Sequence, residues 1–226
     1  MQRVGYIVAR TAVVAFGIAL LAGVPPAMLF AETAAECTGA PGRDFRPINI
    51  GLFSNGVPAS SEMPTGSHEI ATPFGFISFC MRNPDQCADP SGQPQIVHLD
   101  EGTWKTLLSV NEHVNNTMKF EDDMAHFGKK EYWTISKDGF GDCEDNALTK
   151  RKELIDDGFP AAALRIAVVH TWEKLPHAVL TVATDRGDYV LDSRNWRVLP
   201  WNKTDYVWIS RKDAGTPMGW ISLNGG

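Results

Sequence analysis

The chain has 226 residues, of which 43% are hydrophobic and 21% are charged. These values are those of an ordinary globular protein, and one domain of this size can bury most of its apolar surface. The first 31 residues hold two of the 21 basic residues and none of the 27 acidic ones, so the remainder has a formal charge of −8. That charge argues against a nucleic-acid partner.

Residues 1–31 have the pattern of a secretory signal peptide. Arg3 and Arg10 are basic, and the apolar stretch 11–24 is shorter than the roughly 20 residues that a membrane-spanning helix needs. We expect cleavage after Ala31 or a few residues later, with an uncleaved anchor as the alternative. Residues 32–226 are then predicted to form a single domain that is periplasmic or secreted, with a catalytic core at about 103–210.

Export would place the four cysteines in a compartment where disulfides persist. Cys80 and Cys87 could close a small loop, although spacing alone leaves the connectivity open. Cys143 would then stay reduced for chemistry, and Cys37 would be left over near the amino terminus.

The predicted elements change in character along the chain. Residues 32–95 are rich in Gly, Pro and Ser, which predicts irregular structure. Residues 103–127 carry apolar side chains at helical spacing and predict one long helix, with a break near Asn115 as the alternative. A second helix is predicted at 143–157, where Asp142 can cap its start.

Strands follow the second helix. The composition of four later segments is typical of strands, with a tight turn at 185–187; the segments are 163–171, 177–184, 188–192 and 206–210. Helices followed by strands indicate an α+β domain in which a helix packs on an antiparallel sheet.

Cys143 occupies the first turn of the second predicted helix. A thiol attacks as its thiolate, and the unpaired N–H groups of a helix amino terminus favour negative charge. The same groups can stabilise the oxyanion of an acyl-transfer intermediate. Against this, Asp142, Glu144 and Asp145 surround the thiol with negative charge, which disfavours the thiolate unless a cation compensates.

His177 and Asp192 fall on the predicted hairpin. Residues opposed across a two-residue loop share a face of the sheet and have numbers that sum to an odd value. The numbers of His177 and Asp192 also sum to an odd value, so both side chains project from one face. A helix on that face could bring Cys143 to them as nucleophile, with His177 as base and Asp192 as the group that orients it.

Each of these residues also has an ordinary structural explanation. A cysteine is often a small buried hydrophobe, a strand histidine is often structural, and Asp192 could begin a turn. His170 is an alternative base, although it lies at the far end of the preceding strand. The parity of the residue numbers by itself therefore does not decide whether Cys143, His177 and Asp192 form a catalytic triad.

Three segments resemble the motifs of the bacterial transglutaminase-like cysteine proteinases. They are residues 141–145 (Gly-Asp-Cys-Glu-Asp), 176–180 (Pro-His-Ala-Val-Leu) and 190–192 (Val-Leu-Asp). The resemblance runs from about Val110 to Trp201, with further likeness around Trp133. Asn146 departs from the family, in which an aromatic residue is frequent, and so does the segment from Cys80 to Cys87.

The resemblance implies a papain-like, transglutaminase-like core with Cys143, His177 and Asp192 as the triad. It also implies a periplasmic protease that needs calcium, held by Asp142, Glu144 and Asp145, since hard oxygen ligands suit that ion. A solvated acidic helix start is the alternative for these three carboxylates. The implied partners are a large surface adhesin as substrate and an inner-membrane regulatory receptor.

Two other functions fit the same sequence. A transglutaminase or amidase would form the same acyl-enzyme and differ only in the acceptor of the acyl group. A calcium-responsive binding protein would keep the fold without turnover. Incorporation of a labelled amine would indicate the first, and a phenotype insensitive to Cys143→Ala would indicate the second.

Overall fold

The computed structural model describes residues 56–64, 66, 68–88 and 95–223. The predicted signal peptide and Cys37 lie outside the described residues. Among the described residues, no helix has both the length and the apolar character needed to cross a membrane.

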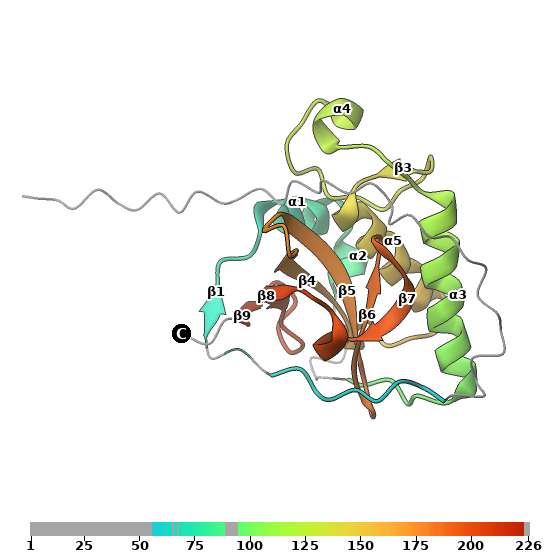
Figure 1. The fold of residues 1–226 in the computed structure, drawn as a ribbon. Helices are drawn as coiled ribbons and strands as arrows, with labels where there is room; N and C mark the ends of the chain where they lie inside the picture. Colours follow the sequence, from blue (N-terminus) through green and yellow to red (C-terminus); the bar gives the residue numbers. More distant parts are fainter. Residues whose placement is uncertain (1–55, 65, 67, 89–94, 224–226) are drawn as a thin grey trace, which may run out of the picture. The chain divides into compact units, whose positions relative to one another are not determined.

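The strands of the described chain form one main antiparallel sheet, in the order β1-β9-β8-β4-β5-β6-β7 (Figure 1). Its strands are β1 (Glu69–Ile70), β4 (Leu164–His170), β5 (Pro176–Thr184), β6 (Gly187–Asp192), β7 (Asn195–Pro200), β8 (Val207–Lys212) and β9 (Trp220–Ser222). The short strands β2 (Lys119–Phe120) and β3 (Phe140–Gly141) pair separately, in parallel. The four predicted strands are present within one or two residues at each end.

The described residues form five α-helices. Helix α5 packs on β4, β5 and β6, and α3 packs on α5, β6 and β7 (Figure 1). The five helices are α1 (Phe74–Arg82), α2 (Pro84–Cys87), α3 (Glu101–Thr117), α4 (Asp123–Phe127) and α5 (Cys143–Asp156). Two short 3₁₀ turns, η2 (Ala161–Ala163) and η3 (Trp201–Lys203), flank the sheet strands.

Residues along a strand alternate between the two faces of the sheet, and in β4 the residues on both faces are buried. Leu164 and Ile166 of β4 belong to the main core beneath the helices. Ala167 and Val169 belong to a second cluster, against which Trp201, Tyr206 and Trp208 pack. The aromatic residues near the carboxyl terminus therefore serve in part as a cover for the sheet.

The prediction of one unbroken helix over 103–127 is wrong for residues 118–122, and the alternative of a break near Asn115 is close to the structure, because α3 ends at Thr117 and α4 begins at Asp123. A capping box between Asp100 and Thr103 starts α3, and the helix ends at Thr117. The Lys119 N–H then donates to the Gly139 carbonyl, and the Glu121 N–H donates to the Gly141 carbonyl. Pairing with a distant segment thus replaces the helical hydrogen bonds, which no local pattern could reveal.

The prediction of irregular structure over 32–95 is wrong for residues 74–87, which form α1 and α2. Phe76 and Phe79 bury their rings in the main core, and Phe76 contacts Trp133 and Trp220 edge-on. The proposed loop closure between Cys80 and Cys87 is present as a disulfide with a Cα–Cα distance of 5.5 Å. The disulfide and these rings hold a segment whose composition is that of a loop.

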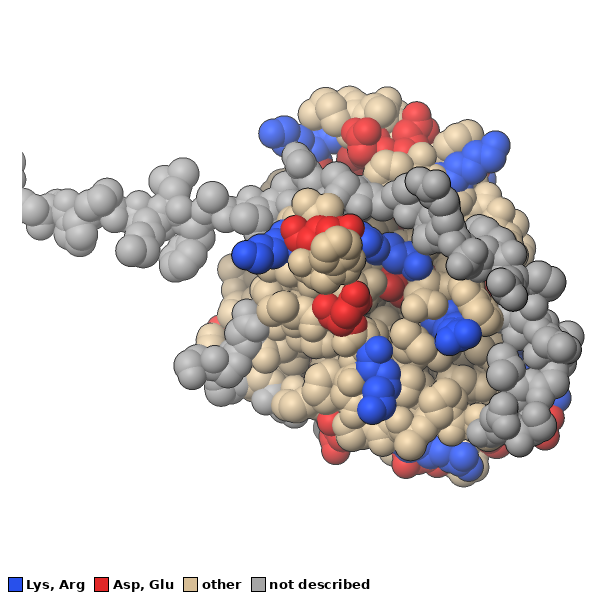
Figure 2. Space-filling view, viewed as in Figure 1, with Lys and Arg blue, Asp and Glu red and all other residues tan. Residues whose placement is uncertain are grey.

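Charged side chains of both signs are interspersed on the face that Figure 2 shows. Lysine and arginine side chains lie beside aspartate and glutamate side chains there, and the described residues on this face form no broad patch of one sign.

Candidate active site

The amino terminus of α5 positions Cys143. Asp142 occupies the N-cap position, although its side chain makes no capping hydrogen bond. The Ala178 N–H of β5 donates to Cys143 Sγ at 3.0 Å, and the sulfur lies 3.2 Å from Glu144 Oε2. Cys143 is buried, and its apolar neighbour is Ala178. The helix start and the central strand therefore meet at the sulfur.

The sulfur of Cys143 is itself disulfide-bonded in this structure. The expectation that Cys143 stays reduced is therefore wrong for this structure. Because only a thiolate is nucleophilic, this bond must be reduced before Cys143 can attack a substrate.

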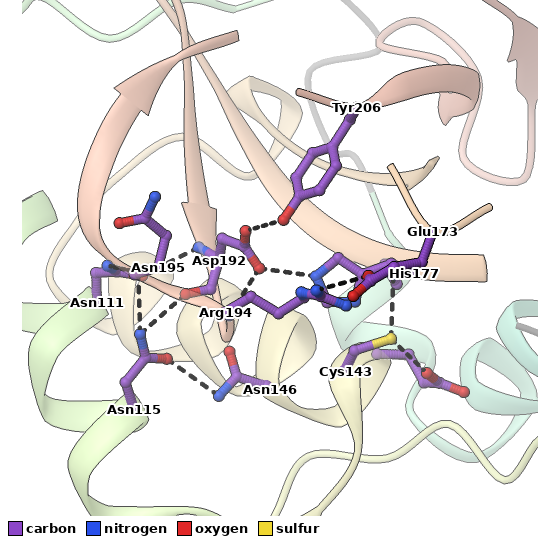
Figure 3. Close-up of polar contacts among 12 residues, drawn as sticks. Asn111, Asn115, Cys143, Asn146, Glu173, His177, Asp192, Arg194, Asn195 and Tyr206 are labelled. Carbon is purple, nitrogen blue, oxygen red and sulfur yellow. Dashed lines mark hydrogen bonds and ion pairs between the residues drawn. The ribbon is translucent and has the colours of Figure 1, made fainter. Parts of the chain in front are cut away.

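The hairpin of β5 and β6 brings His177 and Asp192 together. Leu180 lies opposite Leu191 and Thr184 lies opposite Gly187, so opposed residue numbers sum to an odd value and the two side chains share a face. His177 Nε2 lies 2.7 Å from Asp192 Oδ1, and both residues are buried (Figure 3). Nδ1 is then the ring nitrogen that remains for proton exchange with a nucleophile.

Both carboxylate oxygens of Asp192 have hydrogen-bond donors. The Arg194 N–H donates to Oδ1 at 2.9 Å, and the Tyr206 hydroxyl donates to Oδ2 (Figure 3). Burial alone would raise the pKa of Asp192, but the charge of His177 and the hydrogen bonds from His177, Tyr206 and Arg194 outweigh it and lower the pKa to about 2. Asp192 is thus held as a carboxylate, as an orienting group must be.

Two asparagines of α3 hold the backbone around Asp192. Asn111 accepts a hydrogen bond from the Asp192 N–H at 3.1 Å and donates to the carbonyls of Asn195 and Trp196. Asn115 donates to the Asp192 carbonyl at 2.9 Å and lies 3.4 Å from the side-chain amide of Asn146 on α5 (Figure 3). The site therefore connects α3, α5 and the β6–β7 turn.

An ion pair joins the two loops that flank His177. Arg194 Nη2 lies 3.0 Å from Glu173 Oε2 (Figure 3). The Thr171 hydroxyl also donates to Glu173. Arg194 follows β6 and Glu173 precedes β5, so the pair ties together the chain segments next to Asp192 and His177. Both side chains are partly exposed, and their contribution to stability is small.

A second group of acidic side chains lies beside the start of α5. Oxygen atoms of Asp123, Asp142 and Asp145 all lie within 4.8 Å of one another, and all three residues are buried. One oxygen of each has no hydrogen-bond partner: Asp123 Oδ1, Asp142 Oδ1 and Asp145 Oδ2. Glu144, the remaining predicted ligand, is not in this group and directs Oε2 to the Cys143 sulfur.

Burial followed by mutual repulsion raises the pKa of each acid in this region. The pKa of Asp142 rises to about 7 through burial and the charge of Asp123, and that of Asp145 rises to about 9 through burial and the charge of Asp142. The pKa values of Glu144 and Asp123 are also raised, chiefly by burial. Three buried carboxylates with unpartnered oxygens fit a divalent cation with oxygen ligands, because such an ion would satisfy both the charge and the lone pairs.

Asp123 was missed as a candidate ligand. It belongs to the acidic run 121–123, and α4 brings it to the start of α5. Gly141 leaves room for the side chain of Asp145, since a Cβ at position 141 would lie 2.7 Å from Asp145 Cβ. The only sequence feature that pointed to Asp123 is the acidic run, and nothing in its spacing relates it to Asp142.

One cavity beside these strands does not lie at the cysteine. A pocket of about 770 Å³ lies at the opposite end of β5 and β6, with Arg165, Asp188 and Arg211 in its wall. Neither Cys143 nor His177 lines it. The chemistry of the side chains, and not the size of the cavity, therefore identifies the candidate active site.

Comparison with known proteins gives one family and several solved structures. The family described as bacterial transglutaminase-like cysteine proteinase BTLCP matches residues 67–226. Calcium-bound LapG of Legionella pneumophila is 22% identical over 71% of this chain and 84% of that chain, with a TM-score of 0.47. A second structure of that LapG is 27% identical over 54% and 68% with a TM-score of 0.45, and an EGTA-treated one is 28% identical over 49% and 63% with a TM-score of 0.42. None of the curated proteins compared with the chain matches it.

A cysteine at a helix amino terminus, beside a sheet that carries a histidine–aspartate pair, is the arrangement of a thiol hydrolase. The family match covers more than two thirds of the chain, and the chain therefore belongs to the bacterial transglutaminase-like cysteine proteinases. It is a cysteine peptidase with an α+β fold, as the sequence predicts.

Proposed function

We propose that the chain is an exported protease in which Cys143 is the nucleophile, His177 the base and Asp192 the orienting group. The observation that supports this assignment best is the buried 2.7 Å contact between His177 and Asp192, on the strand whose Ala178 N–H donates to the cysteine sulfur. Donors to both oxygens of Asp192 hold its carboxylate in place, as is needed of a group that orients an imidazole.

The chemistry follows from this arrangement once Cys143 is reduced. His177 accepts the thiol proton, and the thiolate attacks the carbonyl carbon of a peptide bond. N–H groups at the start of α5 stabilise the oxyanion. The tetrahedral intermediate then collapses, the imidazolium protonates the departing amine, and an acyl-enzyme forms. Water, deprotonated by His177, releases the acyl group as a carboxylate.

Calcium is the proposed ion for Asp123, Asp142 and Asp145. Hard carboxylate oxygens suit calcium, and the buried, unpartnered oxygens of these residues are the support for a site here. The ion would supply positive charge close to Cys143 and so favour the thiolate. The calcium-bound form of the LapG structure is consistent with this choice. Glu144 is proposed as a neighbour that the ion also influences.

The proposed substrate is a protein outside the cytoplasm, in the first instance a large surface adhesin. Residues 1–31 are proposed to be a signal peptide, and residues 32–226 a single domain in the periplasm or outside the cell. An inner-membrane receptor is the proposed regulator. The basic and apolar pattern of residues 1–31 supports export, and membership of a proteinase family supports a protein substrate.

The test is the alkylation of Cys143 by iodoacetamide at neutral pH, in a mild reductant, with calcium and with chelator. We expect fast alkylation of the reduced protein with calcium, a fall of at least about tenfold with chelator or in His177→Ala, and no reaction before reduction. The alkylation measured in Cys143→Ala is subtracted to remove the contribution of the other thiols. Equal rates in the native protein and in His177→Ala would contradict the triad.

The acceptor of the acyl group needs a separate assay. The reduced, calcium-loaded protein is incubated with an outer-surface protein extract and a labelled primary amine. This assay shows whether water or an amine accepts the acyl group. New protein termini without label indicate proteolysis. Incorporated label would overturn the protease assignment in favour of a transglutaminase while leaving the triad intact.

A further inference from the structure

A cavity away from the candidate active site has two strand arginines in its wall. Its volume of about 770 Å³ lies within the range of about 300–1,000 Å³ that is usual for binding sites of small organic molecules. Arg165 of β4 and Arg211 of β8 both line it, and neither Cys143 nor His177 does. The proposed protease chemistry therefore gives this cavity no role.

The strand register places the two arginines on one face of the sheet. Ala167 of β4 lies opposite Arg211 of β8. Arg165 comes two residues before Ala167, so its side chain projects from the same face as that of Arg211 and is its diagonal neighbour. Asp188 of β6 lies opposite Ala183 of β5 and projects from this face as well. The three charged side chains therefore meet at the wall of the cavity.

The guanidinium groups of this pair have few acceptors. Arg211 is 2% exposed, and its Nε has no hydrogen-bond partner. Its Nη1 lies 3.4 Å from Asp188 Oδ1, which is longer than the about 2.7–2.9 Å of a charge-assisted hydrogen bond. Arg165, which is partly exposed, donates from Nε to the Ala162 carbonyl at 3.1 Å. A buried guanidinium with so few acceptors is costly, so the pair favours an additional anionic group.

The acidic side chains of the wall do not supply that group. The Met63 N–H donates to Asp188 Oδ2 at 2.6 Å, and backbone N–H groups also donate to Asp185 and Asp213. Glu62, the fourth acid of the wall, is exposed. Within the described part of the chain, the contact with Asp188 is the one ion pair that either arginine makes. Because these acids also repel anions, a ligand with a single negative charge fits better than a doubly charged phosphate.

The remainder of the wall is partly apolar. Met63, Ala183, Ala214 and Ile221 line the cavity and are themselves buried. Apolar groups of a ligand that contact them would be removed from water, which contributes about 0.8 kcal/mol for each buried CH₂ group. The cavity thus combines donors for one anionic group with an apolar surface beside them.

We propose that this cavity binds an organic monocarboxylate with an apolar body, whose oxygens accept hydrogen bonds from the terminal nitrogens of Arg165 and Arg211. A planar guanidinium matches the two oxygens of a carboxylate. A free organic acid and the carboxyl terminus of a peptide that ends in an apolar residue both offer this chemistry. The proposal goes beyond the protease assignment and does not depend on the triad or on calcium.

The experiment is an NMR titration of the full chain with labelled arginine, in which the Nε–H signals are followed. The signals of Arg165 and Arg211 are assigned by the variants Arg165→Lys and Arg211→Lys. We expect both signals to shift and to saturate with 4-methylpentanoate, a free acid, and with N-acetylleucine, which resembles a peptide terminus. Uncharged N-acetylleucinamide should leave them in place, and the signal of Arg197, an exposed residue of β7 outside the cavity, should not move.

The outcomes separate the two sources of the carboxylate. Saturation with N-acetylleucine alone assigns the cavity to peptide termini, and saturation with 4-methylpentanoate alone assigns it to free acids. Saturation with both shows a general carboxylate site. No shift with either acid overturns the proposal, and so does an equal response to N-acetylleucinamide.

A substitution tests the arginine pair by affinity. Arg165→Met is expected to weaken binding of the better acid by at least about tenfold, because one of the two guanidinium groups is lost. The matched control Arg197→Met should keep the affinity. Equal affinity in both variants contradicts the proposal. If Arg165→Met does not fold, Arg165→Lys takes its place, since it keeps the charge and loses the planar fork.

Discussion

At the scale of single residues, Asp192 is the best-supported member of the site. His177, Arg194 and Tyr206 all direct a donor at its carboxylate, which lowers its pKa to about 2 in spite of its burial. Arg194 and Tyr206 both lie outside the three motifs. Tyr206 lies just before β8, which β4 and β5 separate from β6 in the sheet, so only the tertiary structure brings its hydroxyl to Asp192.

Replacement of Tyr206 by phenylalanine tests this contact. Tyr206→Phe leaves one buried carboxylate oxygen of Asp192 without a donor, and a hydrogen bond to a charged group contributes about 1.5–3 kcal/mol. We expect a fall of that size in the free energy of unfolding, with slower alkylation of reduced Cys143, measured by urea denaturation and iodoacetamide kinetics. Tyr189→Phe is the control, since the Tyr189 hydroxyl donates to the Pro58 carbonyl far from the site. Equal alkylation rates in both variants would contradict the role of Tyr206.

At the scale of elements, α3 serves as the support of the β6–β7 turn. Its asparagines satisfy four backbone groups of that turn: the Asp192 N–H and the carbonyls of Asp192, Asn195 and Trp196. Amide side chains suit this task because they both donate and accept. The helix is therefore part of the machinery that fixes Asp192.

Removal of the Asn111 amide tests this support. Asn111→Ala leaves the buried Asp192 N–H and the part-buried Trp196 carbonyl without this partner, while the Asn195 carbonyl keeps the Asn115 amide as a donor. Each buried group left unsatisfied costs about 1–3 kcal/mol. We expect a marked loss of stability together with slow alkylation of Cys143, whereas Asn202→Ala, which removes an exposed contact with Ser61, should change neither. Urea denaturation of both variants measures the difference. A stable and fully reactive Asn111→Ala protein would show that α3 does not hold Asp192.

At the scale of the whole molecule, the acidic cluster joins parts of the chain that the sequence separates. Asp123 belongs to α4, while Asp142 and Asp145 belong to the start of α5. An ion between them would link α4 to the helix that carries Cys143. Calcium is therefore expected to act on stability as well as on reactivity.

Thermal unfolding measures that link. An ion that binds only the folded state at about 100 times its Kd stabilises a protein by about 2.7 kcal/mol. We expect saturating calcium to raise the Tm of the native chain by several degrees and to leave the Tm of Asp123→Asn unchanged. Asp122→Asn changes the neighbouring carboxylate, which caps α4 instead, and should keep the calcium response. A response that survives Asp123→Asn would exclude this residue as a ligand.

The pH dependence of stability tests the buried lysine in the intact fold. The pKa of Lys150 falls from 10.5 to about 7 on folding, mainly through burial. Between these values the unfolded chain binds the proton and the folded chain does not, so this residue makes stability rise with pH from about 7 upward. We expect the Lys150→Met protein to be the more stable at pH 7 and its advantage to shrink by pH 9. An advantage that does not change with pH would show that Lys150 titrates normally.

The sequence by itself determined the helix that starts at Cys143, the four central strands and the shared face of His177 and Asp192. These features depend on local periodicity, on turn residues and on strand parity, all of which act within a few residues. The family resemblance of residues 141–145, 176–180 and 190–192 was also legible, and the family match confirms it.

Only the tertiary structure decided the rest. The end of α3 at Thr117, the place of Asp123 beside Asp142, the donor from Tyr206 and the burial of Lys150 each depend on contacts between segments far apart in the chain. A local pattern cannot express such contacts, because burial and charge pairing are properties of the packed core and not of sequence spacing.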